Sequence, residues 1–215
     1  MDIGTVLRGA AAKVIGVDSE HISRFHTRRG ELCTPLELLA IPSLAWNRMT
    51  GKANHTPWMA PRAVMYLDRL LRPEDVLLEL GSGDSTAWYA RRVHRVVSLE
   101  PSSHWAARVR ARLAGHPNAE VREGPVSGTY LAALSELQPT VLIVDHSDEP
   151  RLTRTDAIRA ALRNGAQPRV IVLDDSDRGA YAPVAELLAH WRTNRFTGFR
   201  GQPLRLTETT VFIGE

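Results

Sequence analysis

The arrangement of apolar residues along the chain changes in character near residue 72. Before that point, apolar residues recur at helical spacing in two segments. They are Ile3, Val6, Leu7, Ala10 and Val14 in the first segment, and Val64, Leu67 and Leu71 in the second. The second segment follows Pro61, a residue typical of the first turn of a helix. We therefore predict that residues 1–72 form a helical N-terminal extension that packs on the rest of the chain.

From residue 76 onward, short apolar runs alternate with helical patterns. The runs are Val76–Leu80, Val96–Glu100, Ala119–Arg122, Val141–Asp145 and Val170–Asp174. Such runs are typical of strands buried on both faces in a parallel sheet with crossover helices. The helices are expected at Ser85–Arg92, Ser103–Leu113, Tyr130–Leu137, Thr153–Asn164 and Pro183–Trp191. The pattern predicts an α/β fold over residues 73–215, with helices on both faces of a mostly parallel sheet and an antiparallel edge hairpin from segments 196–201 and 208–213.

Composition narrows the setting of the protein. A chain of 215 residues with 43% hydrophobic content can bury one substantial core, so both parts are expected to form one structural unit. The formal charge is only +3 and the basic residues are dispersed, which gives little support to a nucleic acid or membrane partner. Cys33 is the sole cysteine, and neither a signal peptide nor an apolar run of ~20 residues is present. We expect a cytoplasmic protein, and the sequence favours no particular oligomeric state.

A glycine turn follows the first predicted strand, with the sequence Gly81-Ser82-Gly83-Asp84-Ser85-Thr86. Ligands of open parallel sheets bind beyond the carboxyl ends of the strands, and glycines let a ligand approach the backbone. The second strand ends at Glu100, nineteen residues after Gly81, where a carboxylate can accept hydrogen bonds from both hydroxyls of a ribose. This combination predicts a site for an adenosine-containing cofactor.

Position 86 and the nearby acids distinguish between such cofactors. A nicotinamide dinucleotide normally requires G-x-G-x-x-G, whereas Thr86 takes the place of the third glycine. S-adenosylmethionine has no phosphate and carries a sulfonium cation, which favours carboxylates such as Glu79 near the turn. We therefore predict S-adenosylmethionine as cofactor. A nicotinamide-dependent oxidoreductase and a purely structural glycine turn remain alternatives.

Three segments resemble the class I S-adenosylmethionine-dependent methyltransferases, and the resemblance covers about residues 56–213. The segments are TPWMAPRAVMYLDRLL, ELGSGDSTAWYARRVHRVVSLEPSSHW and VIVLDDSDR, and they are similar to a bacterial branch that pairs G-S-G-x-S-T with D-x-S-D-R. The resemblance implies a Rossmann-like sheet, with Glu100 on the ribose of the cofactor. Other residues that it implies around the cofactor are Glu79, Gly81, Ser82, Gly83, Ser85, Thr86 and Asp145. It also implies that the loop with His55 and Trp58 lies near the methyl acceptor.

The fourth strand ends in Val144-Asp145-His146-Ser147, where a base for methyl transfer is expected. An amino-group methyltransferase acting on DNA bases would show an N-P-P-Y-like motif here, and its absence disfavours nucleic acid as substrate. His146 suits proton transfer near neutrality and is our candidate base together with Asp145, although a structural histidine is an equal alternative.

Acids at the ends of adjacent strands raise the question of a metal. Asp145, Asp174 and Asp175 offer oxygen ligands for Mg²⁺. Alternatively, Asp174 and Asp177 cap turns and Asp145 faces only the amine of the cofactor. The sequence does not commit the chain to a metal, and we assign Asp175 to the acceptor side. The expected function is methylation of a small molecule, with a hydroxyl as the preferred acceptor. The alternative is a non-catalytic cofactor-binding or partner-binding protein of the same fold.

Overall fold

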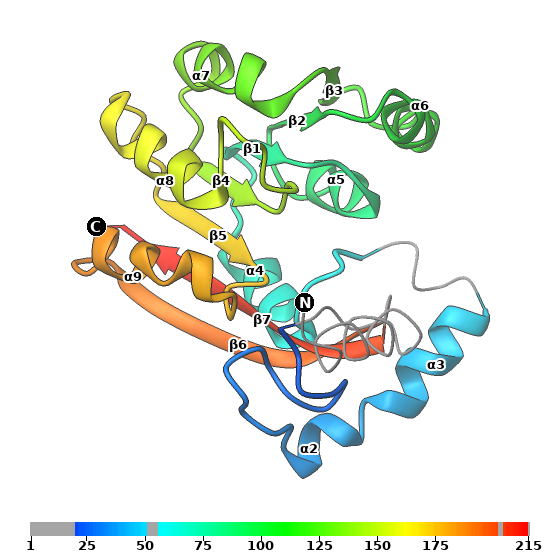
Figure 1. Cartoon of the computed structure of the whole chain (residues 1–215). Coiled ribbons are helices and arrows are strands. Elements are labelled where there is room, and N and C mark those ends of the chain that lie inside the picture. Colours follow the sequence, from blue (N-terminus) through cyan, green and yellow to red (C-terminus); the bar gives the residue numbers. More distant parts are fainter. Residues whose placement is uncertain (1–19, 51–55, 202–203, 215) are drawn as a thin grey trace, which may run out of the picture.

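The computed structural model describes residues 20–50, 56–201 and 204–214, and a seven-stranded sheet organises them (Figure 1). Its order is β3-β2-β1-β4-β5-β7-β6. The strands are β1 Val76–Leu80, β2 Arg95–Glu100, β3 Ala119–Glu123, β4 Val141–Val144, β5 Val170–Asp174, β6 Arg192–Gly201 and β7 Leu204–Ile213. β1 to β5 pair in parallel, and β7 runs antiparallel to both β5 and β6. The predicted mostly parallel sheet with a C-terminal antiparallel hairpin is confirmed.

Helices cover both faces of this sheet, as the alternation of patterns predicts. On one face lie α4 Pro61–Leu70, α5 Asp84–Ala90 and α6 Ser103–Arg112; on the other lie α7 Val126–Leu137, α8 Arg154–Arg163 and α9 Pro183–Leu187. Leu67 and Tyr89 pack with Ile143 on the first face, whereas Tyr130 and Ile158 pack with Leu142 on the second. Neighbouring residues of β4 thus point into different core clusters, so the strand is apolar throughout.

Several element boundaries differ from the sequence prediction. The hairpin strands are ten residues each rather than six, because β7 lies between β5 and β6 and is buried along nearly all its length. Its polar side chains, such as Thr207 and Thr209, donate hydrogen bonds to buried acids and so conceal the strand from a hydrophobicity pattern. α9 ends at Leu187, four residues before the predicted end.

The N-terminal extension lies along the C-terminal hairpin. Its described helices are α2 Pro35–Leu38, α3 Ile41–Met49 and α4, while residues 20–34 form turns around a bridge between His26 and Leu32 rather than a helix. The amide of Leu206 in β7 donates to the carbonyl of Arg24 over 2.9 Å. The helical pattern of residues 3–14 falls outside the described residues. None of the described helices is long and apolar enough to cross a membrane.

Candidate cofactor and acceptor site

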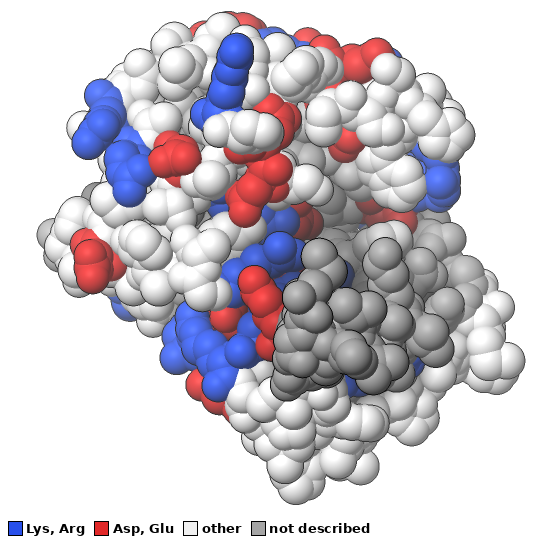
Figure 2. Space-filling view, viewed as in Figure 1, with Lys and Arg blue, Asp and Glu red and all other residues white. Residues whose placement is uncertain are grey.

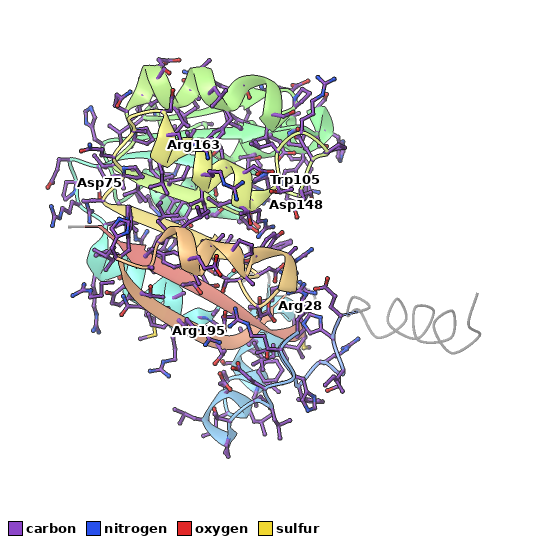
Figure 3. The ribbon with its side chains drawn as sticks, turned by 60° about the vertical axis from the view of Figure 1, so that its left-hand side comes forward. Arg28, Asp75, Trp105, Asp148, Arg163 and Arg195 are labelled. Atoms are coloured by element: carbon purple, nitrogen blue, oxygen red, sulfur yellow. The ribbon has the colours of Figure 1, made fainter. Side chains whose placement is uncertain are left out.

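The register of the sheet brings the predicted acids together at one edge. Glu79 of β1 pairs with Ser98 of β2 and with Ile143 of β4. The positions two residues further along, on the same face of the sheet, are Gly81 after β1, Glu100 in β2 and Asp145 after β4. The equivalent position in β5 is Asp174. In Figure 3, Trp105 and Asp148 mark this carboxyl end of the sheet, and Asp75 lies at the opposite end. The predicted cofactor and acceptor acids therefore occupy one continuous row.

Glu79 is a buried acid that holds the glycine turn in shape. Its carboxylate accepts hydrogen bonds from Ser85 Oγ at 2.5 Å, from Thr86 Oγ1 at 2.7 Å and from Ser98 Oγ. Burial raises the pKa of Glu79 to about 7, against the opposing effect of these three hydroxyl donors. The hydroxyl of Thr86 also accepts from the Gly83 amide at 3.2 Å. Glu79, Ser85 and Thr86 thus form an internal network under the turn, to which Ser98 belongs although the sequence did not single it out.

Gly81 lies where the turn meets the end of β4. Its φ of +91° is in the left-handed region that favours glycine. A Cβ at this position would lie 3.2 Å from the carbonyl oxygen of Asp145 and 3.4 Å from Cα of His146. The contact explains why this position requires glycine, and it sets Asp145 directly beside the turn.

Glu100 is buried, and neighbouring groups hold its carboxylate in place. Oε2 accepts from the amide and the hydroxyl of Ser82 at 3.0 and 2.9 Å, and Oε1 accepts from the Ser102 amide at 2.9 Å. The indole of Trp105 donates to the Ser82 carbonyl at 2.6 Å and so stabilises the same turn. Because each carboxylate oxygen has two lone pairs, three of the four are used here, and Oε1 keeps one for a ligand hydroxyl. Ser102 and Trp105 were absent from the sequence prediction.

A depression of about 360 Å³ continues the row beyond Glu100. It is lined by Pro101, Pro125, Ser127, Glu149, Pro150 and Arg151. Glu149 accepts hydrogen bonds from the amides of Val126 and Ser127 at 2.8 and 3.1 Å, and from the Ser127 hydroxyl at 2.6 Å. This acid therefore anchors the first turn of α7 and one wall of the depression.

Arg154 joins the ends of β4 and β5 at the other side of the turn. Its guanidinium donates to the carbonyls of His146 and Asp174 at 2.7 and 2.6 Å, and to Oδ1 of Asp145 at 3.2 Å. The side chain of Asp145 remains 38% exposed. Sequence reasoning missed Arg154, yet a signal existed, because a cation in the first turn of a helix opposes the helix dipole unless acids lie nearby.

His146 points away from solvent. It is 2% exposed, and its Nε2 lies 3.3 Å from the carbonyl oxygen of Leu152, while Nδ1 has no hydrogen-bond partner among the described residues. Burial and the charge of Arg154 lower the pKa of His146. This geometry favours a structural role, and the role of His146 as a base stays a prediction.

Comparison with known proteins places this arrangement in a fold family. No protein-family model matches the chain, and no curated protein matches it. Among solved structures, it is similar to an O-methyltransferase from Bacillus cereus in complex with SAH, at 18% identity and TM-score 0.59, over 84% of this chain and 98% of the other. The chain has the Rossmann-like methyltransferase fold.

Two further structures support this assignment of the fold. A proposed O-methyltransferase from Klebsiella pneumoniae shares 20% identity at a TM-score of 0.59, over 85% of this chain and 97% of the other. The C-terminal domain of precorrin-6Y C5,15-methyltransferase from Rhodobacter capsulatus shares 16% identity at a TM-score of 0.53, over 72% of this chain and 89% of the other. In this methyltransferase fold, the glycine turn of the present chain lies at the carboxyl edge of the sheet, as predicted from its position after β1.

The acids considered for Mg²⁺ are already engaged with arginines. Asp175 accepts from Arg205 and Arg178 at 3.2 Å each, and its Oδ1 lies 3.3 Å from a nitrogen of Arg28. Asp174 accepts from Thr209 at 2.6 Å, and its Oδ2 lies 3.9 Å from NH1 of Arg200. Within residues 20–50, 56–201 and 204–214, no group of three acidic, histidine or cysteine side chains is arranged to hold a metal. The described residues do not fit Mg²⁺ at this place in the methyltransferase fold.

Of the two residues predicted to approach the acceptor, the structure describes one. His55 lies outside the described residues. Trp58 is half-buried just before α4, two residues from Ala60. The Ala60 amide donates to Oγ1 of Thr209 at 3.1 Å, and the same hydroxyl donates to Asp174 at 2.6 Å. The segment that carries Trp58 is thus tied to the acceptor end of the acid row.

Proposed function

We propose that this protein is an S-adenosylmethionine-dependent methyltransferase of a small molecule, with a hydroxyl as the acceptor. The observation that carries the proposal is the Glu100 carboxylate, which Ser82 and Ser102 hold beside a left-handed glycine turn. The fold is similar to that of O-methyltransferases, one of them in complex with SAH, and this similarity supports the proposal.

The row of residues along the sheet edge fits the parts of this cofactor in order. Glu100 suits a ribose hydroxyl, and the depression beyond it suits the adenine base. The turn formed by Gly81, Gly83 and the start of α5 suits the methionine portion. Glu79 underlies that turn, where a carboxylate favours the sulfonium and ammonium charges. In this proposal Ser82, Ser85 and Thr86 act by shaping the turn.

The chemistry requires little from the protein beyond position and proton removal. When bound, S-adenosylmethionine supplies an electrophilic methyl carbon, which bonds to the acceptor oxygen as the carbon–sulfur bond breaks. We propose that Asp145 takes the proton of the acceptor hydroxyl, because it lies beside the turn and is partly exposed. Partial desolvation raises the pKa of Asp145 above its ordinary value, and the charge of Arg154 opposes this rise.

Calorimetric titration with SAH tests the cofactor assignment directly. Glu100→Ala removes a charged hydrogen-bond acceptor, and one such bond is worth about 1.5–3 kcal/mol, so the dissociation constant should rise at least about tenfold. Glu120→Ala on the adjacent strand β3, an exposed acid in salt bridges with Arg95 and Arg122, is the matched control and should bind SAH as the wild type does. Absence of SAH binding to the wild type, or equal binding by Glu100→Ala, contradicts the proposal.

The two alternatives have their own readouts. Saturable quenching by NADH with no response to SAH would revive the oxidoreductase, which Thr86 disfavours. Tight SAH binding without turnover on a broad panel of hydroxylated acceptors would favour a non-catalytic binding protein. A small-molecule partner, the absence of nucleic acid and membrane partners, and a cytoplasmic location stay predictions.

A further inference from the structure

The acceptor end of the acid row is surrounded by arginines. Arg154 comes from α8, Arg200 and Arg205 from the hairpin, and Arg28 from the N-terminal extension. Figure 2 shows basic and acidic side chains interleaved near the middle of this face. The side chain of Arg28 is 1% exposed, and a guanidinium so deeply buried is rare unless it is paired. These arginines were not anticipated from the sequence.

Most of these cations have close acidic partners. Arg154 bonds Asp145, and Arg28 donates to Oδ1 of Asp177 at 2.8 Å. Arg205 donates to Asp175 at 3.2 Å, and that carboxylate also accepts from Thr207 at 2.8 Å. The carboxylate of Asp175 therefore already accepts hydrogen bonds from groups within about 3.2 Å.

Arg200 differs from its neighbours. Its closest described acidic oxygens are those of Asp174 and Asp175, each 3.9 Å from NH1 and so beyond hydrogen-bond distance. Its Nε, like that of Arg178, is buried and has no hydrogen-bond partner among the described residues. The side chain is only 15% exposed, so little water compensates for the missing acceptor. Donors left in this condition mark a place where an oxyanion would bind.

The ion-pair distances within the cluster also single out Arg200. The shortest printed ion pair is 2.8 Å for Arg28, 3.2 Å for Arg154 and 3.2 Å for Arg205. Both ion pairs of Arg200 with described residues are 3.9 Å long. Arg200 is therefore the guanidinium of this cluster with the most capacity for a further anion.

The Arg200 guanidinium lies at a suitable distance from the glycine turn. Gly81, Asp145 and Asp174 occupy equivalent positions on the neighbouring strands β1, β4 and β5. Neighbouring strands are about 4.8 Å apart, so Asp174 lies on the order of 10 Å from the turn. NH1 of Arg200 lies 3.9 Å from Oδ2 of Asp174. That distance matches the length of a small acceptor with a reacting hydroxyl at one end and a charged group at the other.

We propose that the methyl acceptor carries an oxyanion, a carboxylate or a phosphate monoester, that Arg200 binds. The inference rests on the proposed methyltransferase function and narrows its substrate class. Arg200 acts as a specificity residue: its guanidinium offers a paired donor geometry that a planar carboxylate or a phosphate accepts.

The test compares charged and neutral probes of the same size. 4-Hydroxybenzoate is titrated against 4-hydroxybenzamide, and phenyl phosphate against phenol, into protein with and without saturating SAH. The wild type should bind one of the two anions at least about tenfold more tightly than its neutral counterpart, and the favoured pair distinguishes carboxylate from phosphate. Arg200→Gln should remove the preference, Arg200→Lys should retain part of it, and Arg192→Gln, an exposed arginine on the same strand, should leave it unchanged.

Each contrary result has a definite meaning. No preference for either anion in the wild type overturns the proposal, and so does a preference that survives in Arg200→Gln. If Arg200→Gln fails to fold, a preference in Arg200→Lys equal to that of the wild type overturns it as well. Failure of SAH to bind contradicts the methyltransferase function instead. The titrations of SAH-free protein then still measure whether Arg200 binds the anion.

Discussion

Buried aspartates lie at both ends of the central strands, and their surroundings are opposite. Asp75 precedes β1 and accepts hydrogen bonds from the Arg72 amide at 2.7 Å, from Thr140 Oγ1 at 2.8 Å, and from Arg169 Nε and NH2 at 3.0 and 2.5 Å. Burial alone would raise its pKa, but these donors outweigh burial and lower it. One carboxylate thus ties together the amino ends of β1, β4 and β5.

The carboxyl group of Asp174, at the carboxyl end of β5, accepts one hydrogen bond from the described residues, whereas that of Asp75 accepts four. Oδ1 accepts from Thr209, whereas Oδ2 is buried and has no hydrogen-bond partner among the described residues. Burial, followed by the charges of Asp145 and Asp175, raises its pKa to about 8. At the amino end of the sheet the buried carboxylate is fully hydrogen-bonded and stabilises the fold. At the carboxyl end a buried polar atom has no partner among the described residues, a condition typical of binding sites.

Removal of Asp75 should have the largest effect on stability. Asp75→Ala leaves Arg169 without its buried partner, so the free energy of unfolding should fall by about 3 kcal/mol at pH 7. Because the pKa of Asp75 is lowered in the folded state, its contribution is present above about pH 4 and is lost as the pH falls below that value, so the variants should converge in acid.

Urea denaturation at pH 7 and pH 3 measures both statements. Asp68→Ala, which removes an exposed salt bridge with Arg92, is the matched control and should cost less than about 1 kcal/mol. SAH affinity of Asp75→Ala should stay within about twofold of the wild type. A loss in SAH affinity as large as that of Glu100→Ala would mean that the two ends of the sheet are not separable.

Asp174→Asn should change stability less than Asp75→Ala does, and its effect should depend on pH in the opposite direction. The folded state holds a proton on Asp174 up to about pH 8, whereas the unfolded state releases it near pH 4, so stability falls as the pH rises between these values. Asparagine resembles the protonated acid and has no proton to lose. The melting temperature of the variant should therefore fall less than that of the wild type between pH 6 and pH 9. Parallel melting curves across this range would contradict the raised pKa.

Addition or removal of a divalent metal should have the smallest effect on the melting temperature. The arginines around Asp175 leave no arrangement of described side chains that fits Mg²⁺, so EDTA or added MgCl₂ should shift the melting temperature of the SAH-loaded protein by less than about 1 °C. Sodium chloride at matched ionic strength is the control for screening. A rise of several degrees with MgCl₂ that NaCl does not reproduce would restore the metal hypothesis.

Several features of the site follow from local sequence. The apolar runs and the glycine turn predict β1, α5 and β2 because each depends on residues close in the chain. Gly81 shows the limit of this reasoning: the turn is predictable, but the reason for glycine is its contact with Asp145, 64 residues away. In the same way α7 begins at Val126, before its predicted start, because Glu149 from a distant loop accepts hydrogen bonds from its first amides.

The sequence by itself determined the alternation of strands and helices, the turn after β1 and the acid at the end of β2. Only the tertiary structure decided what surrounds the other acids. Arg28 and Arg205 reach Asp175 from segments that are distant in the chain and carry no local pattern, and the burial of His146 depends on the loop that follows β4. Hydrophobic periodicity records which face of an element is buried, whereas ion pairing and desolvation depend on which elements meet, and these interactions decide the chemistry of the acceptor site.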